Sequence, residues 1–118
     1  MNCSWLILTL SLSGVLVHLQ TSSEVHETSR RIEVHAHRFA FVPAEITVKN
    51  GETVTLELIS DDVSHSLTIR ELGINQTISK GRTSEVTFTP ATTGDYRGQC
   101  GRFCGSGHGS MLFTIHVK

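Results

Sequence analysis

The 118-residue sequence lacks both a disulfide framework and a net charge of either sign. Three cysteines are too few for the dense cross-linking of small exported domains. Ten Lys and Arg against eleven Asp and Glu give a net charge of −1, so bulk charge favours neither nucleic acid nor an anionic membrane as a partner. The chain also lacks an evident base, nucleophile pair or open catalytic pocket, so we do not expect an enzyme by itself. Its length has room for one compact domain.

A long hydrophobic run is absent as well. Residues 5–19 are apolar apart from scattered Ser and Thr, but this run is short for a membrane span and fits the apolar part of a secretory signal better. We therefore predict that residues 1–23 are a signal peptide, with an uncleaved N-terminal membrane anchor as the alternative. Residues 24–30 are predicted to be a polar tether. The expected location is periplasmic or otherwise extracytoplasmic, either soluble or held by a single anchor.

No stretch has the apolar period of a helix, whereas from Arg31 onward apolar residues recur at every second position, as in half-buried strands. Asn50-Gly51, between two such runs, is the strongest short hairpin signal. Seven or eight short strands without an internal repeat predict an all-β sandwich over residues 31–118. The alternating runs are 32–36, 46–48, 54–58, 67–69, 74–78, 86–88 and 111–117.

Two thiols, an imidazole and a thioether fall within one short segment near the carboxyl end, at Cys100, Cys104, His108 and Met111. The spacers are largely Gly and Ser, which allow the backbone to fold around a small object. Soft sulfur donors with imidazole favour copper over hard cations. A thioredoxin-like redox motif is the competing interpretation, but three residues separate the cysteines and the chain lacks alternating strands and helices.

Strand parity separates the histidines. His65 shares the parity of the apolar residues that follow it, so we expect it to point inward at a strand end, where a buried imidazole needs a partner. Parity alone leaves open whether His65 is a metal ligand or a satisfied core residue. His35, His37 and His116 have the opposite parity and are expected to face solvent.

The run from Gly94 to Met111 resembles the binuclear copper (CuA) loop of cytochrome c oxidase subunit II, which is also found in the copper domain of nitrous-oxide reductases. Upstream, Asp62-Val-Ser-His65-Ser resembles the segment that supplies the family's remaining histidine. The similarity covers most of the chain from about Arg31. It implies a cupredoxin-like Greek-key sandwich with copper at one end and an electron-transfer function.

The same resemblance implies that both cysteine sulfurs bridge two copper ions, and that each ion takes one histidine. A thioether is the implied weak ligand of one ion, and a main-chain carbonyl completes the coordination of the other. Tyr96 and Gln99 match the family's approach to the first cysteine, and their implied role is to pack and hydrogen bond beside the site. The implied ligands are His65, Cys100, the main-chain carbonyl of Arg102, Cys104, His108 and Met111.

The sequence departs from the family's pattern at Arg102, where the family usually has a glutamate that reaches toward the catalytic subunit. Leu67 stands where a tryptophan is often found. With its single apolar leader, the chain is expected to be a free-standing or singly tethered electron carrier. A c-type cytochrome and a respiratory oxidase or reductase are the expected redox partners. Phe103 either covers the centre from water or contacts a partner.

Three other functions are weighed against the binuclear centre. A mononuclear blue-copper protein needs only His65, Cys104, His108 and Met111, which leaves Cys100 without a role. A copper chaperone or storage module would release its metal readily. In a purely structural sandwich, Cys100 and Cys104 would form a local disulfide of little stabilising value. Because protons compete for thiolates and imidazoles, copper binding is expected to weaken at acid pH.

Overall fold

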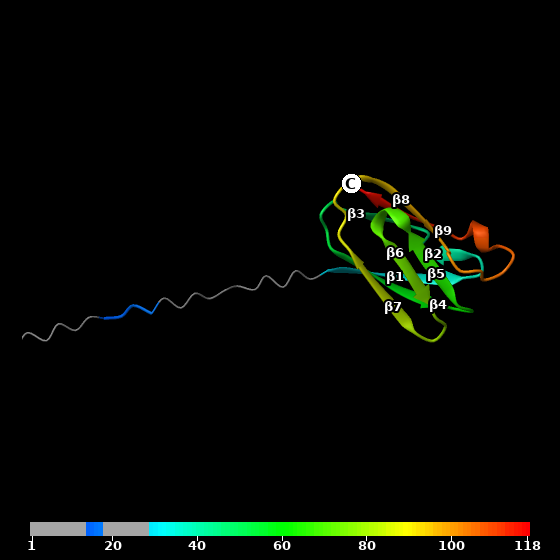
Figure 1. Cartoon of the computed structure of the whole chain (residues 1–118), viewed down its shortest axis with the longest axis horizontal. Helices are drawn as coiled ribbons and strands as arrows, with labels where there is room; N and C mark the ends of the chain where they lie inside the picture. The colour runs from blue at the N-terminus through cyan, green and yellow to red at the C-terminus, as the bar shows by residue number, and fades with distance from the viewer. Residues whose placement is uncertain (1–13, 18–28) are drawn as a thin grey trace, which may run out of the picture.

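The computed structural model describes residues 14–17 and 29–118. The second of these segments forms nine strands in two facing sheets (Figure 1), which confirms the all-β prediction. Most of the predicted signal peptide and most of the predicted tether lie outside the described residues. Within the described part of the chain, no helix combines the length and the apolar character that a membrane crossing requires.

The first sheet has four strands in the order β2-β1-β4-β7. Strand β1 runs parallel to β4, with Ile32 opposite Leu56, and antiparallel to β2. Strand β7 closes the other side antiparallel to β4. The bounds are β1 Arg30–His37, β2 Ala40–Val42, β4 Val54–Ser60 and β7 Thr83–Phe88.

The second sheet has five strands in the order β3-β9-β8-β5-β6. Strands β8 and β9 are antiparallel neighbours, and the amide of Cys100 donates to the carbonyl of Met111 where they separate, at 3.1 Å. This hydrogen bond joins the two ends of the β8–β9 loop where the loop leaves the sheet. The elements are β3 Glu45–Val48, β5 His65–Ile69, β6 Ile74–Ile78, β8 Gly94–Gln99, β9 Leu112–Val117, and the single-turn 3-10 helices Arg70–Leu72 (η1) and His108–Ser110 (η2).

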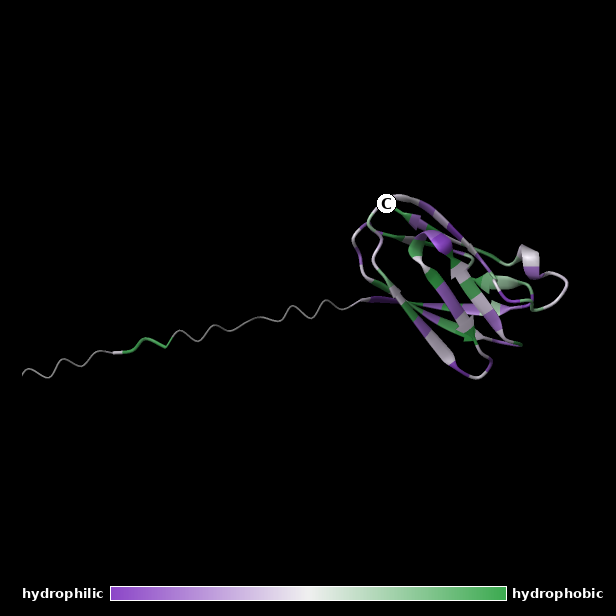
Figure 2. Ribbon diagram, in the orientation of Figure 1, coloured by the Kyte–Doolittle hydropathy of each residue, from purple (hydrophilic) through white to green (hydrophobic). Residues whose placement is uncertain are grey.

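The core lies between the sheets because each strand turns alternate apolar side chains inward. Figure 2 shows this alternation as green and purple bands along the strands. Phe41 of β2 meets Phe113 of β9 edge to face, with ring centroids 5.9 Å apart, so the contact joins the two sheets. Burying each such ring contributes about 1.5–3 kcal/mol to the stability of the fold. The contact therefore holds together the two sheets that carry the loops.

The hairpin predicted at Asn50-Gly51 is wrong. Strands β3 and β4, which flank it, belong to different sheets. The turn is real, with φ of 80° at Gly51, but its amides are held by the carbonyls of Lys118 and Pro90 instead of a hairpin partner. Asn-Gly specifies a tight reversal and does not specify which strands then pair.

Candidate metal centre

Three segments far apart in the sequence meet at one end of the sandwich. These are the β1–β2 turn, the start of β5 and the β8–β9 loop, which includes η2 (Figure 1). Strand β5 is antiparallel to β8, so its first residue lies at the end where the loop leaves β8. The topology therefore places His65 beside Cys100, as expected from the sequence.

The two thiols lie side by side and are not bonded. Cys100 and Cys104 are buried and free, with their Sγ atoms 3.8 Å apart. The Cys100 thiol donates to the carbonyl of Arg102 at 3.0 Å, and the Cys104 thiol lies 3.4 Å from Met111 Sδ. Two thiols, a thioether and a main-chain carbonyl thus line one small volume.

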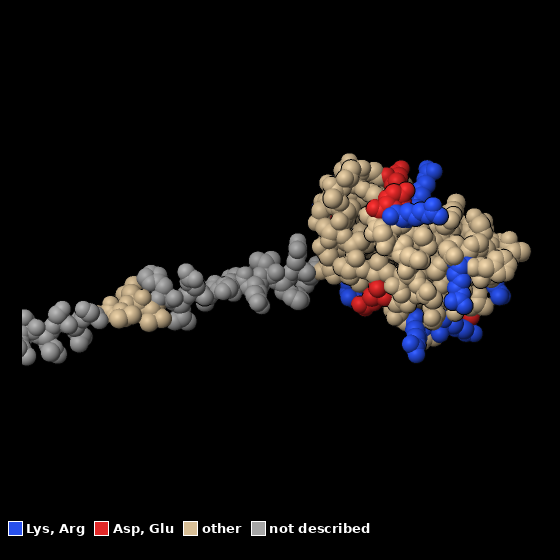
Figure 3. Space-filling view, viewed as in Figure 1, with Lys and Arg blue, Asp and Glu red and all other residues tan. Residues whose placement is uncertain are grey.

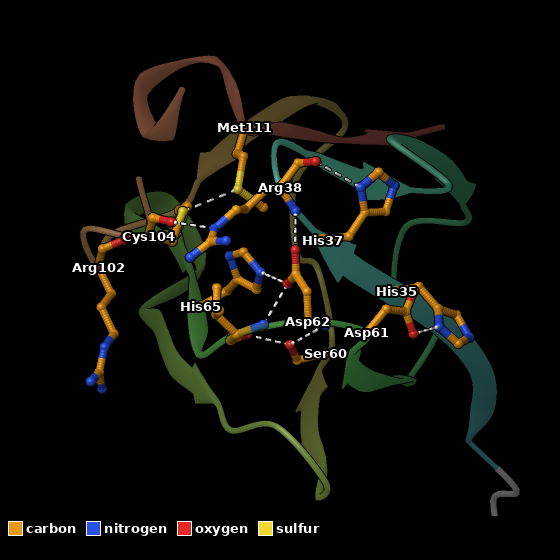
Figure 4. A network of polar contacts seen from close by, with 12 residues as sticks. His35, His37, Arg38, Ser60, Asp61, Asp62, His65, Arg102, Cys104 and Met111 are labelled. Carbon is orange, nitrogen blue, oxygen red and sulfur yellow. Dashed lines mark hydrogen bonds and ion pairs between the residues drawn. The ribbon is translucent and has the colours of Figure 1, made fainter. Parts of the chain in front are cut away.

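His65 is fully buried and only one of its ring nitrogens has a partner. Nε2 lies 2.6 Å from Oδ1 of Asp62, whereas Nδ1 has no hydrogen-bond partner (Figure 4). Burial alone would raise the pKa of Asp62, but hydrogen bonds from His65 and from the amides of Arg38 and Val63 lower this pKa to about 2. Asp62 is therefore an acceptor at neutral pH, and Nε2 carries the proton. Nδ1 then keeps a free lone pair, and it is buried without a protein donor.

The ligand atoms of His65, Cys100 and Cys104 all lie within 4.8 Å of one another. A buried hydrogen-bond acceptor without a donor costs free energy. A metal ion that binds the lone pair of this acceptor removes the cost. Burial is the main cause that raises the pKa of the Cys104 thiol, so a metal must displace protons to bind there. Soft sulfur with imidazole fits copper, and the residues present therefore suit the metal predicted from sequence.

His108 lies at the edge of this group. It begins η2 and is half-buried, with Nδ1 3.9 Å from Cys104 Sγ. Its ring is tilted against that of Phe103, with centroids 6.0 Å apart. Each of the six sequence-predicted ligands is therefore at this end of the sandwich, with His65, the two cysteines and Met111 buried and His108 nearer to solvent.

Residues 7–112 match the family described as the Cupredoxin-like domain. This chain belongs to the cupredoxin-like family.

Among proteins of known function, this cupredoxin-like chain is similar to subunit 2 of cytochrome c oxidase. It is 34% identical over 87 residues to cytochrome c oxidase subunit 2 of Thermus thermophilus, covering 74% of this chain and 64% of the relative. The chain spans 52–64% of the length of the first two curated relatives. It is homologous to subunit II, and the cluster of His65, Cys100 and Cys104 is compatible with a CuA-like site.

Solved structures confirm the cupredoxin fold. The periplasmic domain of subunit II of cytochrome oxidase from Bradyrhizobium japonicum superposes with a TM-score of 0.70 at 20% identity, covering 75% of this chain and 83% of that one. A chain of a heme-copper terminal oxidase dimer superposes with a TM-score of 0.69 at 26% identity, covering 80% and 68%.

No pattern in the sequence identifies the residues of this cupredoxin that hold the β8–β9 loop in place by contacts from other segments. Arg38, in the β1–β2 turn, donates through Nε to the carbonyl of Cys104 at 3.0 Å. Ser66 accepts from the amide of Gly101 at 2.9 Å. The Phe39 ring packs under Gly107, where a Cβ atom would come within 2.4 Å of the ring. Close approach explains the glycine, but no sequence motif identifies its aromatic partner.

The role expected for Tyr96 beside the site is wrong. Its hydroxyl donates to the carbonyl of Thr92 at 2.7 Å, and the residue lies opposite Ile115 within the sheet. Gln99 is at the end of β8, opposite Leu112, and is exposed. Tyr96 thus fastens the start of β8, away from the thiols.

Proposed function

We propose that this protein is a copper-binding electron carrier with a binuclear CuA-like centre. The observation that carries the proposal is the unpartnered, fully buried Nδ1 of His65 beside two free thiols that are 3.8 Å apart. In the proposed centre the two thiolates would be shared by two copper ions, and each histidine would supply a nitrogen ligand. The proposed ligands are His65, Cys100, the carbonyl of Arg102, Cys104, His108 and Met111.

Copper bound by these residues would supply one-electron redox chemistry. The protein's part is to hold the ligands in nearly one arrangement for both redox states. Asp62 orients the His65 ring, and Arg38 and Ser66 fasten the loop by hydrogen bonds to its backbone. The apolar core under the thiols excludes water from one side of the site.

The relatives support a proposal about the wider role. Since those relatives are subunits of cytochrome oxidase, we propose that this chain serves a respiratory oxidase or reductase as a carrier or accessory subunit and is not an enzyme by itself. A c-type cytochrome is the proposed electron donor. The proposed location is extracytoplasmic, because one structural relative is a periplasmic domain.

A mononuclear blue-copper site is the second candidate, and Cys100 decides between the two. Cys100 is 1% exposed, and its sulfur contacts both Cys104 and the carbonyl of Arg102, so its position suits a bridging ligand. Copper analysis with visible and paramagnetic-resonance spectra should give two ions per chain that share one unpaired electron. A Cys100→Ser variant should lose the second ion and the shared-electron spectrum.

A Ser106→Ala variant is the matched control, because Ser106 lies exposed in the same loop. It should keep two ions per chain. One ion in the wild-type protein would end the binuclear proposal. Copper lost readily to a chelator, with no reversible redox couple, would instead identify a chaperone or storage module.

A further inference from the structure

We propose, resting on the function proposed above, that the surface around Arg38, Arg102 and Phe103 docks a redox protein whose own contact surface is acidic. This surface is called the arginine face below. It covers the proposed copper centre from outside. The proposal concerns which kind of partner exchanges electrons with the centre and where it binds.

The apolar part of the arginine face is Phe103. This residue is 77% exposed, although it is aromatic and lies in a loop made largely of Gly and Ser. A single exposed apolar residue is ordinary in proteins. Here, however, the ring borders a pocket of about 340 Å³ that is also lined by Val63, Ser64 and Gly105. An exposed ring beside a hollow gives a partner both an anchor and a place to insert a side chain.

The charge of the arginine face is positive. Arg38 and Arg102 both line the pocket, and among its described lining residues there is no Asp or Glu. The nearby carboxylate of Asp62 is ionised and accepts hydrogen bonds from His65 and from the amides of Arg38 and Val63, so two guanidinium charges stand against this one carboxylate. Figure 4 shows the Arg102 side chain pointing away from the thiols. Figure 3 shows blue side chains predominating toward this end on the face in view.

The arginine face is also in direct contact with the proposed ligands. Phe103 precedes Cys104 in the chain and touches the His108 ring, and Arg38 is hydrogen bonded to the Cys104 carbonyl. A partner seated on Phe103 would thus be separated from a proposed thiolate ligand by one residue. Electron transfer falls steeply with distance, so this is an effective place for exchange.

Charge complementarity points to an acidic partner. Guanidinium groups pair bidentately with carboxylates, and opposite charges raise the rate at which redox proteins meet. The chain as a whole has a net charge of −1, so the attraction comes from the local placement of the arginines and not from the total charge. A partner with a basic contact surface would be repelled at this end.

Cytochrome c provides a matched pair of probes, because the native protein is basic and its lysine-succinylated derivative is acidic. Each ferrocytochrome is mixed with the oxidised, copper-loaded protein, and the haem absorbance is followed. In this step the ferrous haem iron loses one electron and becomes ferric, and the copper centre gains it; no bond or proton changes. The acidic derivative should react about tenfold faster at low ionic strength, and salt should remove the difference.

Reversing one charge separates docking from damage to the copper centre. An Arg102→Glu variant keeps the main-chain carbonyl and should slow the reaction with the acidic derivative while speeding the reaction with native cytochrome c. A damaged centre would slow both. Lys49→Glu is the matched control, because Lys49 follows β3 at the opposite end of the sandwich and the charge change is the same. Its two rates should stay close to those of the wild type.

Metal-free protein gives a readout that does not depend on copper. Amide NMR signals of Arg38, Arg102 and Phe103 should shift when the acidic derivative is added to the wild type and not when it is added to Arg102→Glu. A protein that binds no redox-active copper contradicts the proposed function, whereas the NMR titration still tests docking. Equal rates with both probes, or NMR shifts caused by anionic phosphatidylglycerol vesicles but not by the acidic derivative, would overturn the docking proposal.

Discussion

At the scale of single residues, the centre depends on how the His65 ring is held. Its Nε2 is fixed by ionised Asp62, and its Nδ1 is buried without a partner. Leaving a buried acceptor unpaired costs about 1–3 kcal/mol in the metal-free protein. Metal binding recovers this cost, so the unpaired atom favours the loaded state.

Removing Asp62 should therefore weaken copper binding without removing a proposed ligand. In Asp62→Ala the His65 ring loses its partner and its orientation, and we expect the affinity for copper to fall by about 10–100-fold. The measurement is a titration in competition with a chelator of known affinity. Asp61→Asn is the control, since Asp61 is bonded to His35 on the surface. Unchanged affinity in Asp62→Ala would show that the ring needs no such support.

His116 predicts a pH effect on stability away from the metal centre. A hydrogen bond with Asp95 of β8 is the main cause that raises its pKa, and Glu45 of β3 raises it further. A raised folded-state pKa stabilises the fold fully below the unfolded value of about 6.5, and this stabilisation is lost as pH rises through the raised value. His116→Gln should thus lower the unfolding midpoint of metal-free protein at pH 5.5 and leave it nearly unchanged at pH 9.

The difference between the two proteins should be small, because the pair is on the surface. Asp95→Asn should reduce the same pH dependence. A His116→Gln effect that is equal at both pH values would contradict the assignment.

At the scale of elements, the β8–β9 loop is shaped by the turn between β1 and β2. The Phe39 ring lies against Gly105 and Gly107, and Arg38 holds the Cys104 carbonyl. The loop that carries the proposed ligands is thus packed on a segment of the opposite sheet. Its glycines allow this approach, because any Cβ at these positions would meet the ring.

Gly107→Ala should disturb this packing. The added Cβ would come within 2.4 Å of Phe39, and relieving the overlap typically costs about 1–3 kcal/mol. We expect a fall of roughly 4–20 °C in the unfolding midpoint of the metal-free protein and weaker copper binding. Gly109→Ala is the control, because a Cβ there would meet nothing within 4 Å. If both variants behaved alike, the Phe39 contact would not shape the loop.

The sequence predicted which residues gather at this end of the sandwich, but not the residues that support them. Cys100 to Met111 lie in one short segment, and strand parity predicted that His65 points inward, so local patterns were enough to place them. Arg38 and Phe39 act through tertiary contacts that have no spacing rule. Asn50-Gly51 failed as a hairpin signal because local turn chemistry does not determine in which sheet the next strand lies.

At the scale of the whole molecule, the period of two in apolar residues predicted a sandwich of seven or eight strands, and the described residues form nine. Strand β2 has only three residues, and β8 has Gly, Tyr and Gln in place of alternating apolar residues, so neither has the pattern that predicts a strand. The closed sandwich brings three distant segments together at one end. Figure 1 shows that this end projects the loop beyond the sheets.

Copper-edge X-ray absorption of the loaded protein tests the central claim most directly. Two ions bridged by Cys100 and Cys104 predict sulfur and nitrogen scattering together with a short copper–copper vector, at two ions per chain. That vector should be absent in Cys100→Ser and present in Ser106→Ala. Sulfur and nitrogen scattering without a copper–copper vector, at one ion per chain in the wild type, would contradict the binuclear centre.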